Sequence, residues 1–256
     1  MEIKKIVILF IFLISMSHAF CQKGFQNLKE YDYAQYHFGF LLGYSQMGYS
    51  IKLNKSELNT PFQANEIGGA ESQTVQLTSV EPIPAFGFTI GIIGNLRLGE
   101  HLDLRFIPAL TFGAGRSIQY DYNIISNTPV IKDLISIKWK NSSLIAFPLN
   151  LKYKGNRINN ARPYVLGGIK YVLDTSPKVD EIDGNQTTDE VDIKLKTSDI
   201  YGEIGAGFDF YFDWFKMGLE AKMSYGTNLK ANNNSRYTKV IDRLNSKIFQ
   251  LSITFE

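Results

Sequence analysis

Apolar and polar residues alternate with a period of two along most of this chain. In residues 102–113, for example, Leu104 belongs to a mainly apolar set of alternate positions, whereas Asp103 belongs to a more polar set. Such sets lie on opposite sides only in a β-strand. The pattern therefore predicts an all-β protein with about eight long strands, although in one of them both Tyr164 and Val165 fit the apolar face. The predicted strands are residues 37–45, 85–98, 102–113, 143–154, 162–173, 201–212, 215–225 and 246–256.

The connections between these segments alternate between long and short. Long polar stretches occupy residues 46–82, 115–134, 174–197 and 226–245, and short links occupy residues 99–101, 155–161 and 213–214. Outer-membrane barrels have this arrangement, with short periplasmic turns at one end and long extracellular loops at the other. The pattern thus predicts an eight-stranded antiparallel transmembrane β-barrel, OmpA-like in size, with both termini in the periplasm.

The two faces of the predicted strands distinguish a membrane barrel from a soluble one. A soluble, lipocalin-like barrel places its large apolar residues inside and its polar residues outside. In this chain the polar face is rich in glycine and charge, which suits a narrow interior, whereas the apolar face suits contact with lipid. The charged residues expected inside the barrel are Arg97, Asp103, Arg105, Lys152, Glu203, Asp209, Lys216, Glu220 and Lys222.

These interior charges allow two interpretations. In the first, a channel selects ions through Lys170, Lys216 and Lys222 together with Glu203, Asp209 and Glu220. The side chains of a barrel of this size just fill its interior, however, and unpaired buried charges are costly. We therefore predict a structural network in which the charges neutralise one another and close the interior.

The N-terminus has the features of a secretory signal. A short segment with two lysines precedes an apolar run at residues 6–16, which is too short to span a bilayer. The small residues Ala19 and Cys21 then predict cleavage before Gln22, and lipidation of Cys21 is the alternative. The expected organisation is a signal peptide at residues 1–21, a short periplasmic segment at residues 22–36 and the barrel at residues 37–256.

Composition narrows the possible functions further. The chain of 256 residues has 27 Lys and Arg against 25 Asp and Glu, a formal net charge of +2, which argues against nucleic-acid binding. Only one long apolar run is present, so a polytopic helical membrane protein is excluded. Aromatic residues make up 13% of the chain, which favours strands. The single cysteine excludes a disulfide within the chain.

Candidate catalytic and metal-binding residues are few. The chain that remains after signal cleavage has two histidines, His37 and His101, and both fall at the predicted periplasmic ends of strands. A catalytic site near the outer leaflet is therefore not expected, and we predict neither an enzyme nor a cofactor. One acidic loop could bind calcium, but its spacing differs from that of an EF-hand, so a solvated loop is favoured. This loop contains Asp180, Glu181, Asp183, Asp189, Glu190 and Asp192.

Several short motifs resemble the PorT (SprT) family of Bacteroidetes outer-membrane proteins, and the resemblance runs over most of the mature chain. One departure from the family pattern is Ala146, where an acidic residue is expected. The motifs are YHFGF at residues 36–40, LDLRFIP at 102–108, FPLNLKYK at 147–154, RINNARPY at 157–164 and YTKVIDRL at 237–244.

This resemblance implies a non-enzymatic accessory role in type IX protein secretion and in gliding motility. The implied partners are outer-membrane lipid and other components of the secretion machine. Two other functions remain open. The first is a stand-alone, OmpA-like structural or adhesion barrel whose loops bind an extracellular partner, and the second, which is disfavoured, is a lipid-modifying barrel enzyme.

Overall fold

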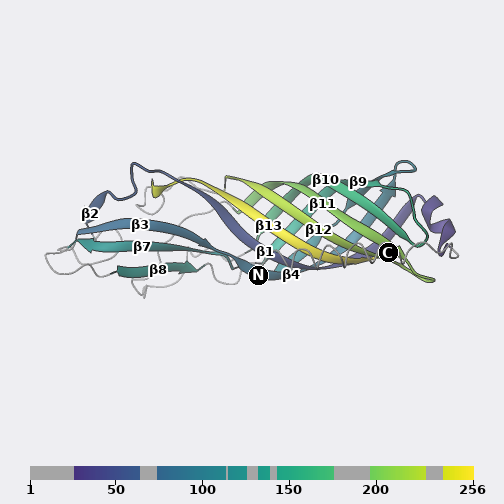
Figure 1. The fold of residues 1–256 in the computed structure, drawn as a ribbon, viewed down its shortest axis with the longest axis horizontal. Coiled ribbons are helices and arrows are strands. Elements are labelled where there is room, and N and C mark those ends of the chain that lie inside the picture. Colours follow the sequence, from purple (N-terminus) through teal and green to yellow (C-terminus); the bar gives the residue numbers. More distant parts are fainter. Residues whose placement is uncertain are drawn as a thin grey trace, which may run out of the picture.

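The fold is a long antiparallel barrel from one end of which a smaller sheet projects, as the computed structural model shows (Figure 1). The structure describes residues 26–63, 74–113, 115–125, 132–138, 143–175, 197–228 and 239–256. The predicted signal peptide at residues 1–21 lies outside the described residues. Within these ranges, no helix is long and apolar enough to cross a membrane.

The barrel is a closed ring of antiparallel strands, each paired mainly with its neighbours in the chain. Pairing of the first strand with both the last strand and the second barrel strand closes the ring, so the prediction of an eight-stranded barrel is confirmed. The strands are β1 (Tyr36–Leu53), β4 (Ala85–Arg97), β5 (Leu102–Phe106), β6 (Ala109–Phe112), β9 (Leu144–Lys154), β10 (Ala161–Asp174), β11 (Ser198–Tyr211), β12 (Lys216–Asn228) and β13 (Ile241–Phe255).

Strands β5 and β6 occupy a single place in the ring, because both pair with β4 on one side and β9 on the other. The interruption falls at Ile107 and Pro108, and proline has no backbone N–H with which to continue a ladder. The carbonyl oxygen of Pro108 still accepts a hydrogen bond from the N–H of Ile92 at 3.0 Å. The sequence pattern does not show this break, because it predicts one continuous strand at residues 102–113.

The two faces of the barrel strands are those predicted from the alternation. On β12, Leu219 is 43% exposed on the outside of the barrel, whereas the adjacent Glu220 is 3% exposed and lies inside. The ambiguous pair on β10 is resolved in the same way, since Tyr164 is buried and Val165 is 54% exposed.

Four further strands lie wholly or partly in the stretches predicted to be long loops, so that part of the prediction needs correction. They are β2 (Pro61–Gln63), β3 (Thr74–Ile83), β7 (Ser117–Ile125) and β8 (Lys132–Lys138), paired in the order β2-β3-β7-β8. Figure 1 shows this projecting sheet beyond one end of the barrel, alongside the extended ends of β1 and β13.

The projecting sheet is stabilised by an apolar cluster of its own. Val75 and Leu77 of β3 pack with Ile118 of β7 and with Ile241 and Leu244 of β13, and all five side chains are almost fully buried. Removal of apolar side chains from water is the main favourable term in folding, so these residues hold the sheet together.

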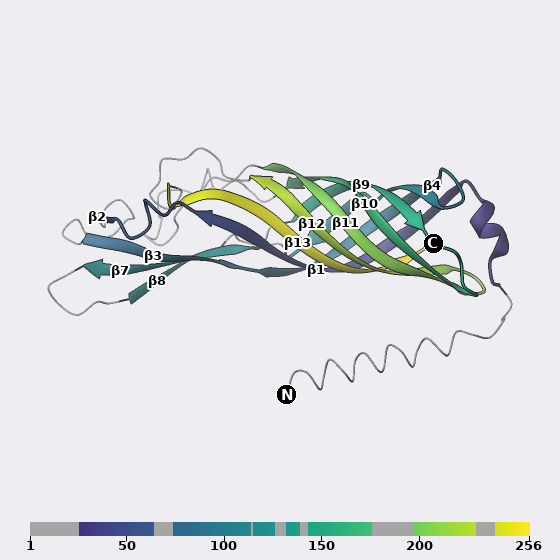
Figure 2. The same cartoon turned by 45° about the horizontal axis from the view of Figure 1, so that its top comes forward.

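The opposite end of the barrel carries the short links and a short 3₁₀ helix, η1 (Lys29–Tyr33), which leads into β1 (Figure 2). We call this the short-turn end. The barrel starts at Tyr36, one residue before the predicted boundary, and the last residue, Glu256, lies at this same end.

Candidate functional site

The interior of the barrel contains a connected network of buried charges. Near the short-turn end, Arg105 of β5 is fully buried, and its guanidinium pairs with the carboxylates of Glu220 and Glu256. The distance from Arg105 Nη1 to Glu220 Oε2 is 2.9 Å. The Lys216 ammonium group also pairs with the Glu256 carboxylate, at 2.8 Å. The Tyr164 hydroxyl donates a hydrogen bond to the Glu220 carboxylate at 2.9 Å. Five residues from the sequentially distant strands β5, β10, β12 and the end of β13 are thus joined.

Two further ion pairs lie beside this cluster. The Lys152 ammonium group is 2.6 Å from Asp209, and it also lies 3.6 Å from the centre of the Tyr164 ring. The Lys154 ammonium group is 2.7 Å from Asp103. All four charged side chains are nearly or completely buried, which requires such close pairing because an isolated buried charge is strongly disfavoured.

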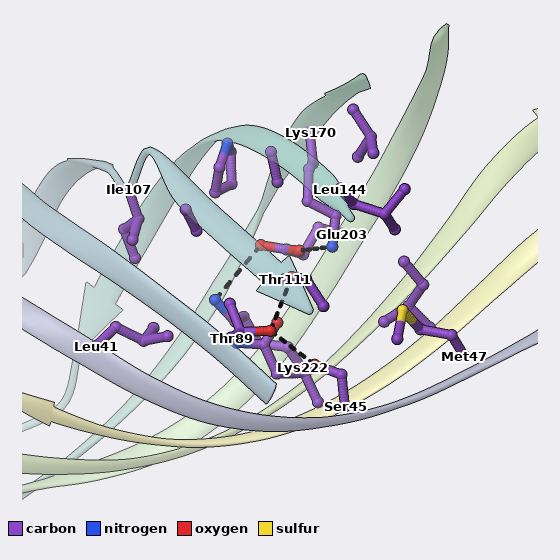
Figure 3. A pocket seen from close by; sticks show the side chains of 16 residues that line it. Leu41, Ser45, Met47, Thr89, Ile107, Thr111, Leu144, Lys170, Glu203 and Lys222 are labelled. Carbon is purple, nitrogen blue, oxygen red and sulfur yellow. Dashed lines mark hydrogen bonds and ion pairs between the residues drawn. The ribbon is translucent and has the colours of Figure 1, made fainter. Parts of the chain in front are cut away.

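A second cluster surrounds Glu203 of β11, nearer the projecting sheet. Its carboxylate lies 2.9 Å from the Lys170 ammonium group and accepts hydrogen bonds from Asn150 and Ser224, each at 2.8 Å. Lys222 joins the two clusters, because its ammonium group is 3.0 Å from Glu220 and 3.8 Å from Glu203. Figure 3 shows Lys170 and Lys222 on two sides of the Glu203 carboxylate.

Glycines on the interior face leave the room that these long side chains need. A Cβ atom at Gly207 would lie 2.6 Å from the Tyr164 hydroxyl oxygen. A Cβ atom at Gly218 would collide with the Thr254 hydroxyl and lie 3.1 Å from Asp209 Oδ1. Both distances are shorter than a normal contact, so glycine at these positions follows from the close packing of Tyr164, Thr254 and Asp209 in the interior.

Beyond the charged clusters the interior is filled by smaller groups. The hydroxyls of Ser45, Thr89 and Thr111 form a chain of hydrogen bonds of 3.1 and 2.9 Å across β1, β4 and β6 (Figure 3). The adjacent cavity has a volume of about 20 Å³, which is room for about one water molecule. Leu41 and Ile107 line the same cavity and are almost fully buried.

The structure places eight of the nine predicted interior residues inside the barrel and one elsewhere. Asp103, Arg105, Lys152, Glu203, Asp209, Lys216, Glu220 and Lys222 are buried and belong to the ion pairs described above. Arg97 is the exception and corrects the prediction. It lies at the short-turn rim, where its guanidinium donates to the carbonyl oxygens of Gly99 and Tyr33. The reason is that Arg97 is the last residue of β4, so the arginine side chain extends beyond the end of the barrel wall.

Sequence reasoning missed several members of the network. Lys154 and Asn150 share the interior face of β9 with Lys152, so their positions were recognisable although their roles were not. Tyr164 was ambiguous, because a tyrosine suits both an apolar surface and a buried hydrogen bond. Glu256 continues the alternate positions of Ser252 and Thr254, which are buried, so its interior position was recognisable as well.

The short-turn end is closed by η1. The Tyr31 hydroxyl donates to Glu256 Oε2 at 3.0 Å, and its ring stacks on His37 with a distance of 3.9 Å between ring centres. Burial, followed by the nearby Glu256 carboxylate, raises the pKa of Tyr31 above its ordinary value, so the hydroxyl stays protonated and donates.

Asp32, the next residue of η1, is held by three groups of the barrel rim. Its carboxylate lies 3.2 Å from Arg157 and 3.1 Å from Arg162, and it accepts a hydrogen bond from the Tyr211 hydroxyl at 2.9 Å. Together with Tyr31, this carboxylate fixes η1 across the end of the interior network.

We expect Asp32→Ala to release η1 without opening the barrel wall. The substitution leaves two arginines without their shared carboxylate, and partly exposed ion pairs of this kind contribute roughly 1 kcal/mol. Limited proteolysis should then cleave near η1 about five times faster, because the detached fraction rises by that factor. Lys29→Ala, in the same helix and exposed, is the control and should leave the cleavage rate unchanged. Equal rates for both variants and the wild type would show that the carboxylate does not hold η1.

The two histidines each contact a neighbouring residue at the short-turn end of the barrel. His37 stacks on Tyr31, and His101 Nδ1 lies 3.0 Å from the carbonyl oxygen of Lys154. In the described part of the chain, no group of three or more His, Cys, Asp or Glu side chains is placed to hold a metal ion. The acidic loop from Asp180 to Asp192 lies outside the described residues.

An apolar outer wall, a charged and filled interior and strands that close into a ring define an integral β-barrel membrane protein. Over residues 25–230, the sequence matches the family described as outer membrane protein beta-barrel domain. The chain belongs to this family, and its place is the outer membrane.

Several solved structures are similar to this chain, among them the outer membrane protein OprG. Neisserial surface protein A has 10% identity and a TM-score of 0.43, covering 86% of this chain and 98% of its own. OprG from Pseudomonas aeruginosa has 13% identity and a TM-score of 0.38, covering 87% and 93%. The attachment invasion locus protein Ail of Yersinia pestis has 10% identity and a TM-score of 0.30, covering 86% and 97%. Among curated proteins, none matches this sequence.

Proposed function

We propose that this protein is a non-enzymatic accessory component of the type IX secretion machine, which supports the export of cargo proteins and gliding motility without forming the conduit. The link to this machine comes from the resemblance of the motifs at residues 36–40, 102–108, 147–154, 157–164 and 237–244 to the PorT family. Membership of an outer-membrane barrel family is consistent with that resemblance.

The observation that carries the accessory role is the filled interior. Arg105 pairs with Glu220 across the lumen, and Lys222 links Glu220 to Glu203. The cavity beside Glu203 has room for about one water molecule. An eight-stranded barrel has an interior just wide enough for its own side chains. A folded cargo protein therefore has no path through this barrel, and any contribution to export acts through its surfaces.

In this proposal the short-turn end, with η1 and Glu256, faces the periplasm, and the projecting sheet faces the cell exterior. Short turns are periplasmic in barrels of this kind, which supports the orientation. The signal peptide at residues 1–21, cleaved before Gln22, delivers the chain to the periplasm. Outer-membrane lipid and other components of the secretion machine are the expected partners, and nucleic acid is not.

The projecting sheet favours a second candidate function, a stand-alone structural or adhesion barrel. Strands β3 and β7 carry a buried apolar cluster, so the sheet can present a fixed surface beyond the membrane. A surface of that kind suits the binding of an extracellular partner whether or not secretion depends on this protein.

Deletion of the gene in the source bacterium, followed by analysis of the secreted proteins, separates these candidates. We expect loss of type IX cargo from the medium and its recovery when the wild-type gene is returned. Normal cargo export combined with an adhesion or envelope defect would contradict the secretion role and support the second candidate.

The same proposal predicts the electrical behaviour of the purified protein in a planar bilayer. Because ion pairs fill the interior, no stable porin-like conductance is expected from the monomer. A large, steady and reproducible conductance would contradict the filled interior and would make the protein a channel. A supporting component is identified if deletion of the gene abolishes cargo export and the purified protein shows no stable conductance in the bilayer.

A further inference from the structure

A groove of about 510 Å³ runs along the outer wall of the barrel at the end that carries the projecting sheet. Its lining residues come from β10, β11, β12 and β13, and most of them face outward, whereas Tyr201 and Gly226 are buried. Its lining includes Ile169, Ile200, Gly202, Tyr225 and Arg243.

The middle of this groove, which we call its floor, is formed by a glycine, so no side chain fills it. Gly202 of β11 lies between Ile169 and Tyr225 in the strand registers, and a Cβ atom at Gly202 would meet no atom within 4 Å. The walls are apolar, with Ile169 61% exposed and Ile200 55% exposed. The exposed residue Ile204, two positions further along β11, continues the apolar surface toward the middle of the barrel.

The other end of the groove is basic. Arg243 and Asn245 of β13 line it, and Lys247 on the same outward face of β13 pairs in register with Tyr225. Arg243 and Lys247 are both exposed, and within the part of the chain that the structure describes neither side chain forms an ion pair. The neighbouring Lys52 differs, because its ammonium group lies 3.2 Å from Asp242.

An apolar floor that leads to unpaired cations matches a molecule with an apolar chain and an anionic head. In an outer-membrane barrel, the boundary between the apolar band and the polar end lies at the level of the lipid headgroups. Cationic side chains at that level attract anionic headgroups, each by about 1 kcal/mol. The missing side chain at Gly202 leaves room for one acyl chain against the wall.

We propose that this groove is a binding site for a phosphorylated, anionic lipid of the outer leaflet. An acyl chain lies over Gly202 between Ile169 and Tyr225, and the phosphate group contacts Arg243 and Lys247. The site uses the outer wall alone and does not depend on a role in secretion, although it does rest on the orientation given above.

Native mass spectrometry of the detergent-purified full-length protein tests this site with three probes. Dioleoyl phosphatidic acid carries both chains and phosphate, dioleoylglycerol carries the same chains without phosphate, and inorganic phosphate has no chains. We expect retention of phosphatidic acid in preference to the other two. Arg243→Gln should reduce its retention about fivefold, which is the factor that corresponds to one cationic contact of about 1 kcal/mol.

Gly202→Leu should reduce retention as well, because the new side chain occupies the floor of the groove. The open space around Gly202 makes this variant compatible with folding, and heat-modifiable gel migration checks that it has folded. Lys29→Gln, which removes an exposed positive charge at the opposite end of the molecule, is the control and should retain lipid like the wild type.

The proposal is supported if both groove variants lose phosphatidic acid and the control does not. Equal loss in Lys29→Gln would show that total charge and not the groove governs retention, and unchanged retention in both groove variants would place the lipid elsewhere. If dioleoylglycerol were retained as well as phosphatidic acid, the phosphate group would not contribute to binding. If inorganic phosphate were retained at the same concentration, the site would bind anions and not a lipid. Each of these results overturns the proposal.

Discussion

Replacement of Arg105 by alanine is expected to destabilise the barrel by about 3–5 kcal/mol. The guanidinium is fully buried between Glu220 and Glu256, so its loss leaves two buried carboxylates with less positive charge around them. Lys222 and Lys216 still contact these carboxylates, at 3.0 and 2.8 Å, but neither lysine can replace two arginine contacts at once. The energetic reason is that breaking one side of a buried ion pair leaves an uncompensated charge in a medium that solvates it poorly.

Reversible urea unfolding in lipid vesicles, followed by heat-modifiable gel migration, measures this change in the free energy of unfolding. Arg97→Ala is the matched control, because it removes the same side chain from the half-exposed rim of the same barrel. Its expected cost is below about 1 kcal/mol, as for other exposed charges. If Arg105→Ala and Arg97→Ala cost the same, the interior network does not contribute to stability in the way its geometry implies.

Leu219→Arg is expected to cost roughly 2–4 kcal/mol if the position lies near the middle of the membrane, and less toward either interface. Leu219 is 43% exposed on the outer wall, where it is opposite Phe208 and Ile253 in the strand registers. An arginine at this position must either bring its charge into hydrocarbon or bend its side chain toward water, and both are unfavourable.

The same unfolding experiment measures this second effect, with Leu219→Phe as the control. Phenylalanine is larger than leucine but apolar, so we expect the control to change stability by less than about 1 kcal/mol. A comparable loss in both variants would indicate that size and not polarity limits the position. No loss in either variant would mean that this face is not in contact with lipid.

These two substitutions test opposite sides of one wall. Leu219 and Glu220 are adjacent in the chain, yet the first contacts the outside of the barrel and the second contacts Arg105. Both sides therefore contribute to the proposed function. In that proposal, the interior closes the barrel to cargo, and the exterior, with the projecting sheet and η1 at its two ends, offers the surfaces on which partners would act.

The alternation of residues made most of the barrel predictable. A strand has a side-chain period of two, so Leu219 and Glu220 must face opposite ways wherever the strand lies. Glycines and charges on one face and large apolar residues on the other then decide which face is inside. The positions of Asp209 and Lys222 in the interior follow from this rule without any knowledge of their partners.

Three features were mispredicted or missed because they depend on contacts between distant segments. The strands β3 and β7 contain polar residues, and their apolar residues Val75, Leu77 and Ile118 become a core only when β13 packs against them. Arg97 obeys the alternation, but the end of β4 places it at the rim. The attachment of η1 depends on Asp32, which lies more than 120 positions away from the arginine partners Arg157 and Arg162.

The sequence by itself determined the number of strands in the barrel, the facing of most side chains in them and the segregation of charge, because these depend on local periodicity within single strands. The tertiary structure decided which charges pair, since Arg105 meets Glu220 and Glu256 only after the ring has closed and the registers are set. It also decided that the chain continues beyond the barrel as a second sheet. Pairing and long-range burial are properties of the closed ring and of the packed sheet, and no single strand carries the information that specifies them.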